Sequence, residues 1–175
     1  MFRIYIKGTP TAALDWDART LTIAMTTKPA ESWDYPAPFV YETQVSPEDI
    51  DAFEHVNNAV YIRWLTECAW AHSAAVGLPE DTCVALRRGM AVRHIDVELL
   101  APARLHDRVR VANWLTDRSR LRATRVFQIK RAPCATTLLR GEVQFVCINL
   151  DSGKPVRMPP EFDLGYQVTL DRPHP

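Results

Sequence analysis

Apolar residues fill most positions between about residues 57 and 76. The run begins at Asn57, which suits a helix N-cap, and ends at Gly77, which suits a C-cap, while Pro79 prevents continuation. The pattern therefore predicts one helix about 30 Å long at the standard rise per residue. Because apolar side chains cover most of its circumference, we expect other elements to wrap this helix.

Segments that alternate between apolar and polar residues account for much of the remaining chain. Strands are predicted at 39–45, 91–99, 109–116, 121–130 and 139–147. Residues 46–49 predict a short helical turn after the first strand, and short connections between the later strands favour antiparallel pairing. The expected fold class is α+β, with a curved antiparallel sheet of about five strands around one long hydrophobic helix.

The N-terminal part of the chain differs in pattern from the rest. It holds two weak strand-like pieces, at 2–7 and 20–25, and it ends in a Pro-rich segment that is typical of a boundary. Met25 is a second candidate start of translation, because the domain pattern begins only after it. We expect an N-terminal extension over 1–37, one domain over 38–162 and a C-terminal tail over 163–175.

Composition is that of an ordinary globular protein. The chain has 175 residues, of which 47% are hydrophobic and 24% charged, a length that supports one full core. Lys plus Arg and Asp plus Glu both number 21, so charge indicates neither a nucleic-acid nor a membrane-surface partner. No apolar run approaches the length of a transmembrane helix, and the first seven residues do not resemble a secretory signal. We expect a cytoplasmic protein.

Cysteine and histidine spacing gives no sign of a metal site. The four cysteines include no C-x-x-C pair, and the five histidines include no H-x-x-x-H pair. Structural zinc sites cluster their ligands, and disulfide frameworks are denser in chains of this size. We expect free thiols and no metal.

A carboxylate just before the long helix is the main candidate for chemistry. Asp51 precedes a polar turn that opens into the helix at Asn58. Unpaired N–H groups and the positive end of the helix dipole meet there, and such donors stabilise an oxyanion. The plain alternative is an acid that only favours the helix start, because Glu48, Asp49 and Glu54 surround Asp51.

The pattern Asp51-x-x-x-His55-Val56-Asn57-Asn58-Ala-x-Tyr61 resembles the hotdog-fold acyl-CoA thioesterases, in the 4-hydroxybenzoyl-CoA thioesterase-like branch. The resemblance covers roughly residues 38–162. It implies that Asp51 is catalytic, as nucleophile or as general base activating water. It also implies that backbone N–H near Asn58 polarises the thioester carbonyl.

The same block supplies the candidate substrate-binding residues, which are His55, Val56, Asn57 and Tyr61. Each has a structural alternative: turn hydrogen bonding for His55, capping for Asn57, and a core position for Tyr61. Glu67 is a second candidate catalytic carboxylate, because some hotdog thioesterases use an acid within the central helix. Its alternative is a surface ion pair with Arg63, four residues earlier.

A run of basic residues supplies candidates for binding the phosphates of coenzyme A. They are Arg122, Arg125, Lys130 and Arg131. The alternative is a solvated hairpin face.

The resemblance implies an acyl-CoA thioesterase that releases a free acid and coenzyme A, with coenzyme A as part of the substrate and no cofactor. It also implies a homodimer or homotetramer. An acyl carrier protein thioesterase and a non-catalytic acyl-CoA-binding protein remain open.

Overall fold

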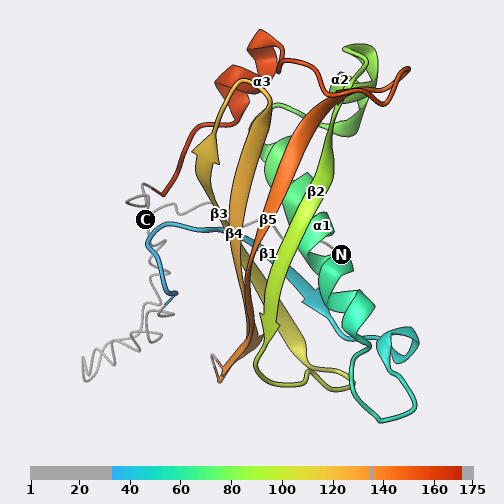
Figure 1. Cartoon of the computed structure of the whole chain (residues 1–175). Helices are drawn as coiled ribbons and strands as arrows, with labels where there is room; N and C mark the ends of the chain where they lie inside the picture. Colours follow the sequence, from blue (N-terminus) through green and yellow to red (C-terminus); the bar gives the residue numbers. More distant parts are fainter. Residues whose placement is uncertain (1–32, 135, 171–175) are drawn as a thin grey trace, which may run out of the picture.

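A computed structural model describes residues 33–134 and 136–170, and in it a single antiparallel sheet curves around a long helix (Figure 1). The strand order is β1-β3-β4-β5-β2. The strands are β1 (Phe39–Gln44), β2 (Arg88–Leu99), β3 (Arg108–Arg118), β4 (Arg122–Ala132) and β5 (Thr136–Asn149). The predicted α+β class and five antiparallel strands are confirmed.

The helices are η1 (Pro47–Asp49), α1 (Asn58–Ala75), α2 (Glu80–Ala85) and α3 (Pro160–Gly165). The sequence pattern predicted η1 and α1 but neither α2 nor α3, because six residues are too few to show a helical period. Both unpredicted helices lie at the end of the molecule opposite the start of α1 (Figure 1).

The two ends of α1 are determined by local sequence. The Asn57 side chain accepts a hydrogen bond from the Ala59 N–H (2.9 Å), as an N-cap does. At the other end Gly77 adopts φ 86°, and the Leu78 N–H donates to the Ser73 carbonyl (2.8 Å). This is a Schellman motif, which a residue with positive φ permits. The predicted helix boundaries are confirmed.

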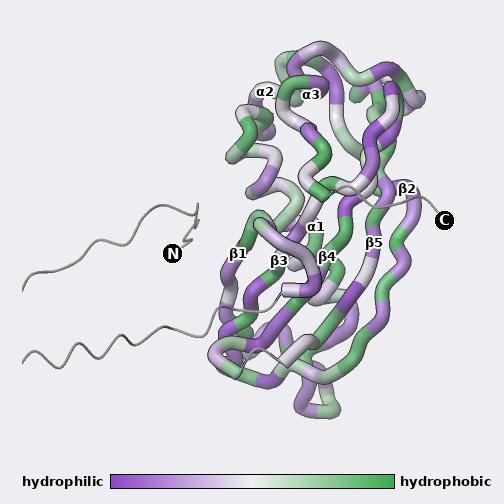
Figure 2. Tube along the Cα trace, turned by 90° about the vertical axis from the view of Figure 1, so that its left-hand side faces the viewer, coloured by the Kyte–Doolittle hydropathy of each residue, from purple (hydrophilic) through white to green (hydrophobic). Residues whose placement is uncertain are grey.

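The core lies between α1 and the face of the sheet that curves around it. Side chains from α1 pack there against alternate residues of the strands, and the alternation is visible along the tube in Figure 2. Its buried members include Trp64, Leu65, Cys68, Val111, Phe127, Ile129 and Leu139.

The predicted packing of a curved sheet around α1 is confirmed, and the side of the helix away from the sheet stays open in the single chain. Arg63, Thr66 and Trp70 face outward, and Trp70 is 43% exposed. The sheet covers only one side of the helix, and the edge strand β2 exposes Val92 nearby. A bulge between Val92 and His94 also breaks the strict alternation predicted for this strand.

Residues 33–37, from the predicted extension, pack on the face of the sheet opposite α1. The rings of Trp33 and Tyr35 meet the Trp114 ring edge-on at 6.5 and 5.5 Å, and the Trp114 indole N–H donates to the Pro36 carbonyl (2.7 Å). The two strand-like pieces predicted earlier in the chain, at 2–7 and 20–25, lie outside the described residues.

The predicted C-terminal tail also contributes to the domain. Tyr166 is buried, and the Thr169 hydroxyl accepts a hydrogen bond from the Leu115 N–H (2.9 Å). In the part of the chain that the structure describes, no helix is long and apolar enough to cross a membrane.

Candidate functional site

A tight loop fixes Asp51 directly before α1. The Asp51 N–H donates to the His55 carbonyl (2.9 Å), and the Glu54 N–H donates to the Asp51 carbonyl (3.1 Å). The Asp51 carboxylate accepts from the Phe53 N–H (2.8 Å), which is an Asx turn. A β-bridge between Ile50 and Val56 closes the loop. The half-buried Asp51 carboxylate is therefore held in one place by its own backbone.

This loop and the first turn of α1 dock on residues 101–103. The Val56 N–H donates to the Ala103 carbonyl (3.1 Å), and the Ala103 N–H donates to the Tyr61 hydroxyl (2.7 Å). Val56 and Tyr61 are both buried. The structure thus places these two candidate substrate-binding residues in the core, where they hold the site together.

The start of α1 leaves a backbone donor beside the loop. The N–H groups of Ala59 and Val60 are taken by the side chain and the carbonyl of Asn57, each at 2.9 Å. Asn58 is exposed, and its N–H, as the first of the helix, has no intrahelical acceptor. Of the two predicted asparagines, Asn57 is the cap and Asn58 carries the available N–H.

The neighbouring acid Asp49 is engaged in an ion pair. Asp49 is 2% exposed, pairs with Arg63, and accepts hydrogen bonds from the N–H (2.9 Å) and hydroxyl (3.1 Å) of Ser46. Burial alone would raise the pKa of Asp49, but the hydrogen bonds from Ser46 and Arg63 outweigh it and hold the pKa below its usual value. Asp51 forms no ion pair with any described residue.

Glu67 does not join Asp51. Its carboxylate accepts a hydrogen bond from the Tyr41 hydroxyl (2.8 Å) and lies 3.6 Å from the Arg63 guanidinium. It stands nine residues after Asn58, which is about 13 Å along the helix axis. The predicted pair with Arg63 is confirmed.

The four candidate phosphate-binding cations do not form one cradle. Arg122 and Arg131 lie near opposite ends of β4, about 30 Å apart at the usual rise per residue. Arg125 is buried on the side of α1, whereas Lys130 lies on the other face, with its ammonium 5.2 Å from the Trp33 ring. The interpretation of these residues as one surface cradle is therefore wrong.

Arg131 lies at the end of the sheet where α1 begins. Its guanidinium donates to the Asp107 carboxylate (2.8 Å) and to the Pro102 carbonyl, so it holds the segment on which Val56 and Tyr61 dock.

Arg125 forms the centre of a buried polar network. One terminal nitrogen donates to His72 Nδ1 (2.8 Å) and to the Asn113 carbonyl oxygen (3.1 Å), and the other donates to the Ser73 hydroxyl (3.2 Å). Burial and the charge of Arg125 lower the pKa of His72 to about 4. His72 is therefore neutral at pH 7, and its Nδ1 also lies 2.9 Å from the Asn113 carbonyl oxygen.

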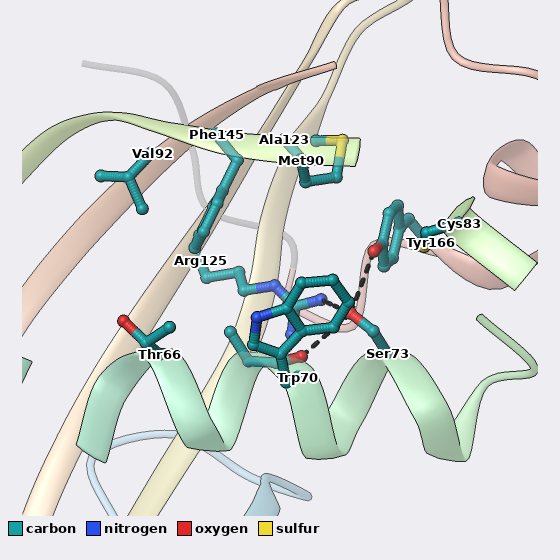
Figure 3. Close-up of a pocket in the computed structure, with 11 residues that line it drawn as sticks. Thr66, Trp70, Ser73, Cys83, Met90, Val92, Ala123, Arg125, Phe145 and Tyr166 are labelled. Atoms are coloured by element: carbon teal, nitrogen blue, oxygen red, sulfur yellow. Dashed lines mark hydrogen bonds between the residues drawn. The ribbon is translucent and has the colours of Figure 1, made fainter. Parts of the chain in front are cut away.

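A cavity of about 60 Å³ adjoins this network, between the C-terminal half of α1 and strands β2, β4 and β5 (Figure 3). Its lining includes Trp70, Ser73, Met90, Arg125, Phe145 and Tyr166. A second, smaller cavity of about 10 Å³ shares Thr66, Val92 and Phe145 with the first. It extends along α1 toward Ile62.

Sequence reasoning missed this network, although one signal was present. Arg125 occupies an inward position between Ala123 and Phe127 in a strand that otherwise alternates regularly. A charged residue at an apolar position is informative, because such residues are rarely buried without a partner. Tyr166 gave no signal, since it lies beyond the last predicted strand. No cluster of three metal-ligating side chains occurs within residues 33–134 and 136–170.

A protein family and several solved structures are similar to this chain. Residues 45–164 match the thioesterase-like superfamily. A comparison with curated proteins found no match. Among solved structures, Slr0204, a 1,4-dihydroxy-2-naphthoyl-CoA thioesterase from Synechocystis, is 24% identical with a TM-score of 0.68, over 74% of this chain and 96% of that one.

Two structures from Staphylococcus aureus are also similar. SAV2348, solved in complex with CoA, is 19% identical with a TM-score of 0.68, over 78% of this chain and 90% of that one. A DHNA-CoA thioesterase is 19% identical with a TM-score of 0.64, over 67% of this chain and 78% of that one. These likenesses confirm the predicted hotdog fold.

Proposed function

This chain belongs to the thioesterase-like superfamily, and we therefore infer that it is a thioester hydrolase whose catalytic carboxylate is Asp51. One observation carries the assignment of the residue. Asp51 is half-buried, fixed by an Asx turn and free of any ion pair with described residues, and it lies just before a helix whose first N–H is available. Asp49 and Glu67 are both held by Arg63.

An acyl-CoA thioester is the proposed substrate. Two of the similar structures are named as CoA thioesterases, and SAV2348 was solved with CoA bound, which supports a CoA ester for this chain as well. The phosphates would contact the end of the sheet where α1 begins. The exposed Arg104 and Arg108 lie there, close to Asp107 and Arg131.

Two routes use Asp51. As a nucleophile its carboxylate attacks the carbonyl carbon, the C–S bond breaks, and the thiolate leaves and takes a proton from water. A water molecule then hydrolyses the mixed anhydride. As a general base Asp51 accepts a proton from the water that attacks the carbonyl carbon directly, after which the C–S bond breaks and the leaving thiolate takes up that proton. In both routes the charge on the carbonyl oxygen is stabilised by the Asn58 N–H, a donor typically worth about 3 kcal/mol.

A homodimer fits the exposed surfaces. The free edge of β2 and the exposed Trp70 and Val92 lie on one side of the chain, and burying them in a second copy would cover the uncovered side of α1. Sedimentation of the purified protein tests this assignment, and a monomer at micromolar concentration would contradict it.

Thiol release measured over acyl-CoAs of graded chain length tests the function. Asp51→Asn keeps the oxygen that accepts from the Phe53 N–H, so the loop should stay folded. We expect turnover to fall about 10²- to 10⁴-fold, the usual contribution of a positioned base. Glu67→Gln is the matched control and should keep most of the activity.

Four outcomes separate the alternatives. A folded Asp51→Asn protein with wild-type turnover would remove Asp51 from the mechanism, and loss of activity in Glu67→Gln alone would move the catalytic role to Glu67. Turnover of acyl carrier protein thioesters without turnover of acyl-CoA would show that the substrate is carried by acyl carrier protein and not by coenzyme A. Binding of acyl-CoA without hydrolysis of any thioester would indicate a non-catalytic binding protein.

A further inference from the structure

Arg125 brings a positive charge into the interior, where the Phe145 and Tyr166 rings lie 5.9 and 5.3 Å from its guanidinium carbon but no carboxylate of the described residues pairs with it. The residue is 3% exposed, and its acceptors on His72, Asn113 and Ser73 are all neutral groups. Arginine stays protonated in proteins, and a buried charge normally pairs with an opposite charge because leaving it unpaired is costly. The surroundings of Arg125 therefore favour an anion that the described residues do not themselves provide.

The hydrogen bonds around Ser73 show which way the donors point. The Ser73 hydroxyl donates to the Ala69 carbonyl (2.9 Å), so its oxygen accepts from Arg125 (3.2 Å) and from the Tyr166 hydroxyl (2.9 Å). All three side chains line the larger cavity (Figure 3). The Ser73 and Tyr166 protons are thus used within the network, whereas Arg125 has more N–H groups than the three that donate to His72, Asn113 and Ser73. It can therefore still donate to a ligand with acceptor oxygens.

The remaining walls of the cavity are apolar. Trp70, Met90, Val92 and Phe145 line the cavity as well, and the Phe145 ring centroid lies 5.9 Å from the Arg125 guanidinium carbon. A volume of about 60 Å³ holds roughly four water-sized groups, enough for a carboxylate and the first carbons of a chain. One end of the ligand is therefore polar and the rest is hydrocarbon.

The two cavities run along α1 toward the candidate catalytic end. The smaller cavity reaches Ile62, one helical turn after Asn58. From Asn58 to Ser73, which accepts from Arg125, the helix advances 15 residues, or about 22 Å. A chain attached to a thioester at Asn58 and running along this line would end at Arg125.

We propose that Arg125 binds a carboxylate at the end of a long alkyl chain, and that substrates include ω-carboxy-acyl thioesters, the thioesters of dicarboxylic acids. The substrate part rests on the proposed function, because it places the thioester at Asn58. A free fatty acid, the hydrolysis product of an ordinary acyl thioester, offers the same carboxylate. The experiment must therefore distinguish the acyl end of a substrate from a released acid.

The first arm compares matched thioesters on the wild-type full-length protein. ω-Carboxy-acyl-CoAs of graded length are tested against their ω-methyl esters, which keep the length but lose the charge. We expect KM to be roughly 10- to 100-fold lower for the carboxylate, the range of charge-assisted hydrogen bonds, and the difference to vanish for chains too short to span about 22 Å. Equal KM values at every length would overturn the substrate assignment.

The second arm uses variants. Arg125→Met should abolish the difference, and since it disturbs a buried network, Thr66→Phe provides a second variant that leaves Arg125 in place. Thr66 is exposed, and its hydroxyl bonds only to the Ile62 carbonyl of its own helix (3.1 Å). A phenylalanine there should block the path between the two cavities. The ratio of KM values between the ω-methyl ester and the ω-carboxylate should then fall at least 10-fold. Ala74→Phe, on the same helix and outside both cavities, is the control and should change nothing.

The third arm is calorimetric titration with a long-chain dicarboxylate and with a fatty acid of equal length, which needs no turnover. If either acid binds the wild type and binds Arg125→Met more weakly, the carboxylate site is supported. Such binding without hydrolysis of any thioester would refute the proposed function and leave the site standing. Fatty-acid binding together with equal KM values for the matched esters would identify the released acid as the ligand. No binding of either acid would overturn the site.

Discussion

Replacing Arg63 by methionine would leave Asp49 buried without its cation. Breaking a fully buried pair costs about 3–5 kcal/mol, whereas an exposed pair is worth about 0–1 kcal/mol. The Arg63 side chain is 52% exposed, and both hydrogen bonds from Ser46 to Asp49 would remain. We therefore expect a loss of about 2 kcal/mol in the free energy of unfolding at pH 7, or about 4–8 °C in Tm.

The size of this loss should depend on pH. In the wild type the pKa of Asp49 lies below its ordinary value of 3.8, so the pair contributes stability above that value and loses it as the pH falls through the folded-state pKa. Without Arg63, burial should raise the pKa of Asp49. Both proteins then approach the same protonation state in acid, and the difference in stability should narrow as the pH falls from 7 toward 4.

Urea unfolding monitored by tryptophan fluorescence at several pH values measures both effects. A double-mutant cycle with Asp49→Asn isolates the pair, and we expect a coupling of at least about 1 kcal/mol. Arg63→Lys keeps a charge and serves as control. Because the Asp49 carbonyl accepts the Asn57 N–H (2.9 Å), the variant should also loosen the start of α1 and lower kcat. An unchanged free energy of unfolding, or a loss that does not vary with pH, would refute the reasoning.

His72, Tyr61 and Gly77 each test a different local argument. Since the pKa of His72 is lowered to about 4, the wild type should lose up to about 3 kcal/mol of stability as the pH falls from 6.5 toward 4; a His72→Gln protein with an equally steep profile would contradict this. Tyr61→Phe leaves the buried Ala103 N–H without its acceptor and should cost about 1–3 kcal/mol by denaturant unfolding while KM stays constant; a changed KM would restore Tyr61 as a substrate contact. In Gly77→Ala the new methyl group meets nothing within 4 Å, so only the positive φ of 86° opposes it, and a thermal melt should show about 1–2 kcal/mol of destabilisation rather than none.

Local signals made most of the fold predictable. The N-cap Asn57 starts α1 and Gly77 ends it, and each residue acts on the backbone within a few residues of its own position. Alternation likewise identified all five strands, because each side chain pattern reflects one buried face. The motif from Asp51 to Asn58 was also found, since a loop and the helix after it are contiguous in sequence.

Contacts between distant segments could not be predicted in this way. Arg63 was expected to pair with Glu67 on the same helix, yet its buried partner is Asp49, 14 residues earlier and in another element. The run of cations that looked continuous is divided between two faces by the alternation of β4 itself. The inward position of Arg125 in β4 follows from the sequence alternation. Its hydrogen-bond partners come from α1 and β3, however, and only the packing of these elements brings them together.

The segment from Trp33 to Ala37 has a consequence for how copies of this protein can assemble. It closes the face of the sheet opposite α1 with its own aromatic rings, and Asp34 ties it down through Gln128 (3.0 Å) and Arg140. Two sheets cannot stack back to back on that face unless these residues first leave it. The segment therefore opposes back-to-back stacking on this face, whereas the edge strands β1 and β2 each have only one neighbouring strand within the described residues.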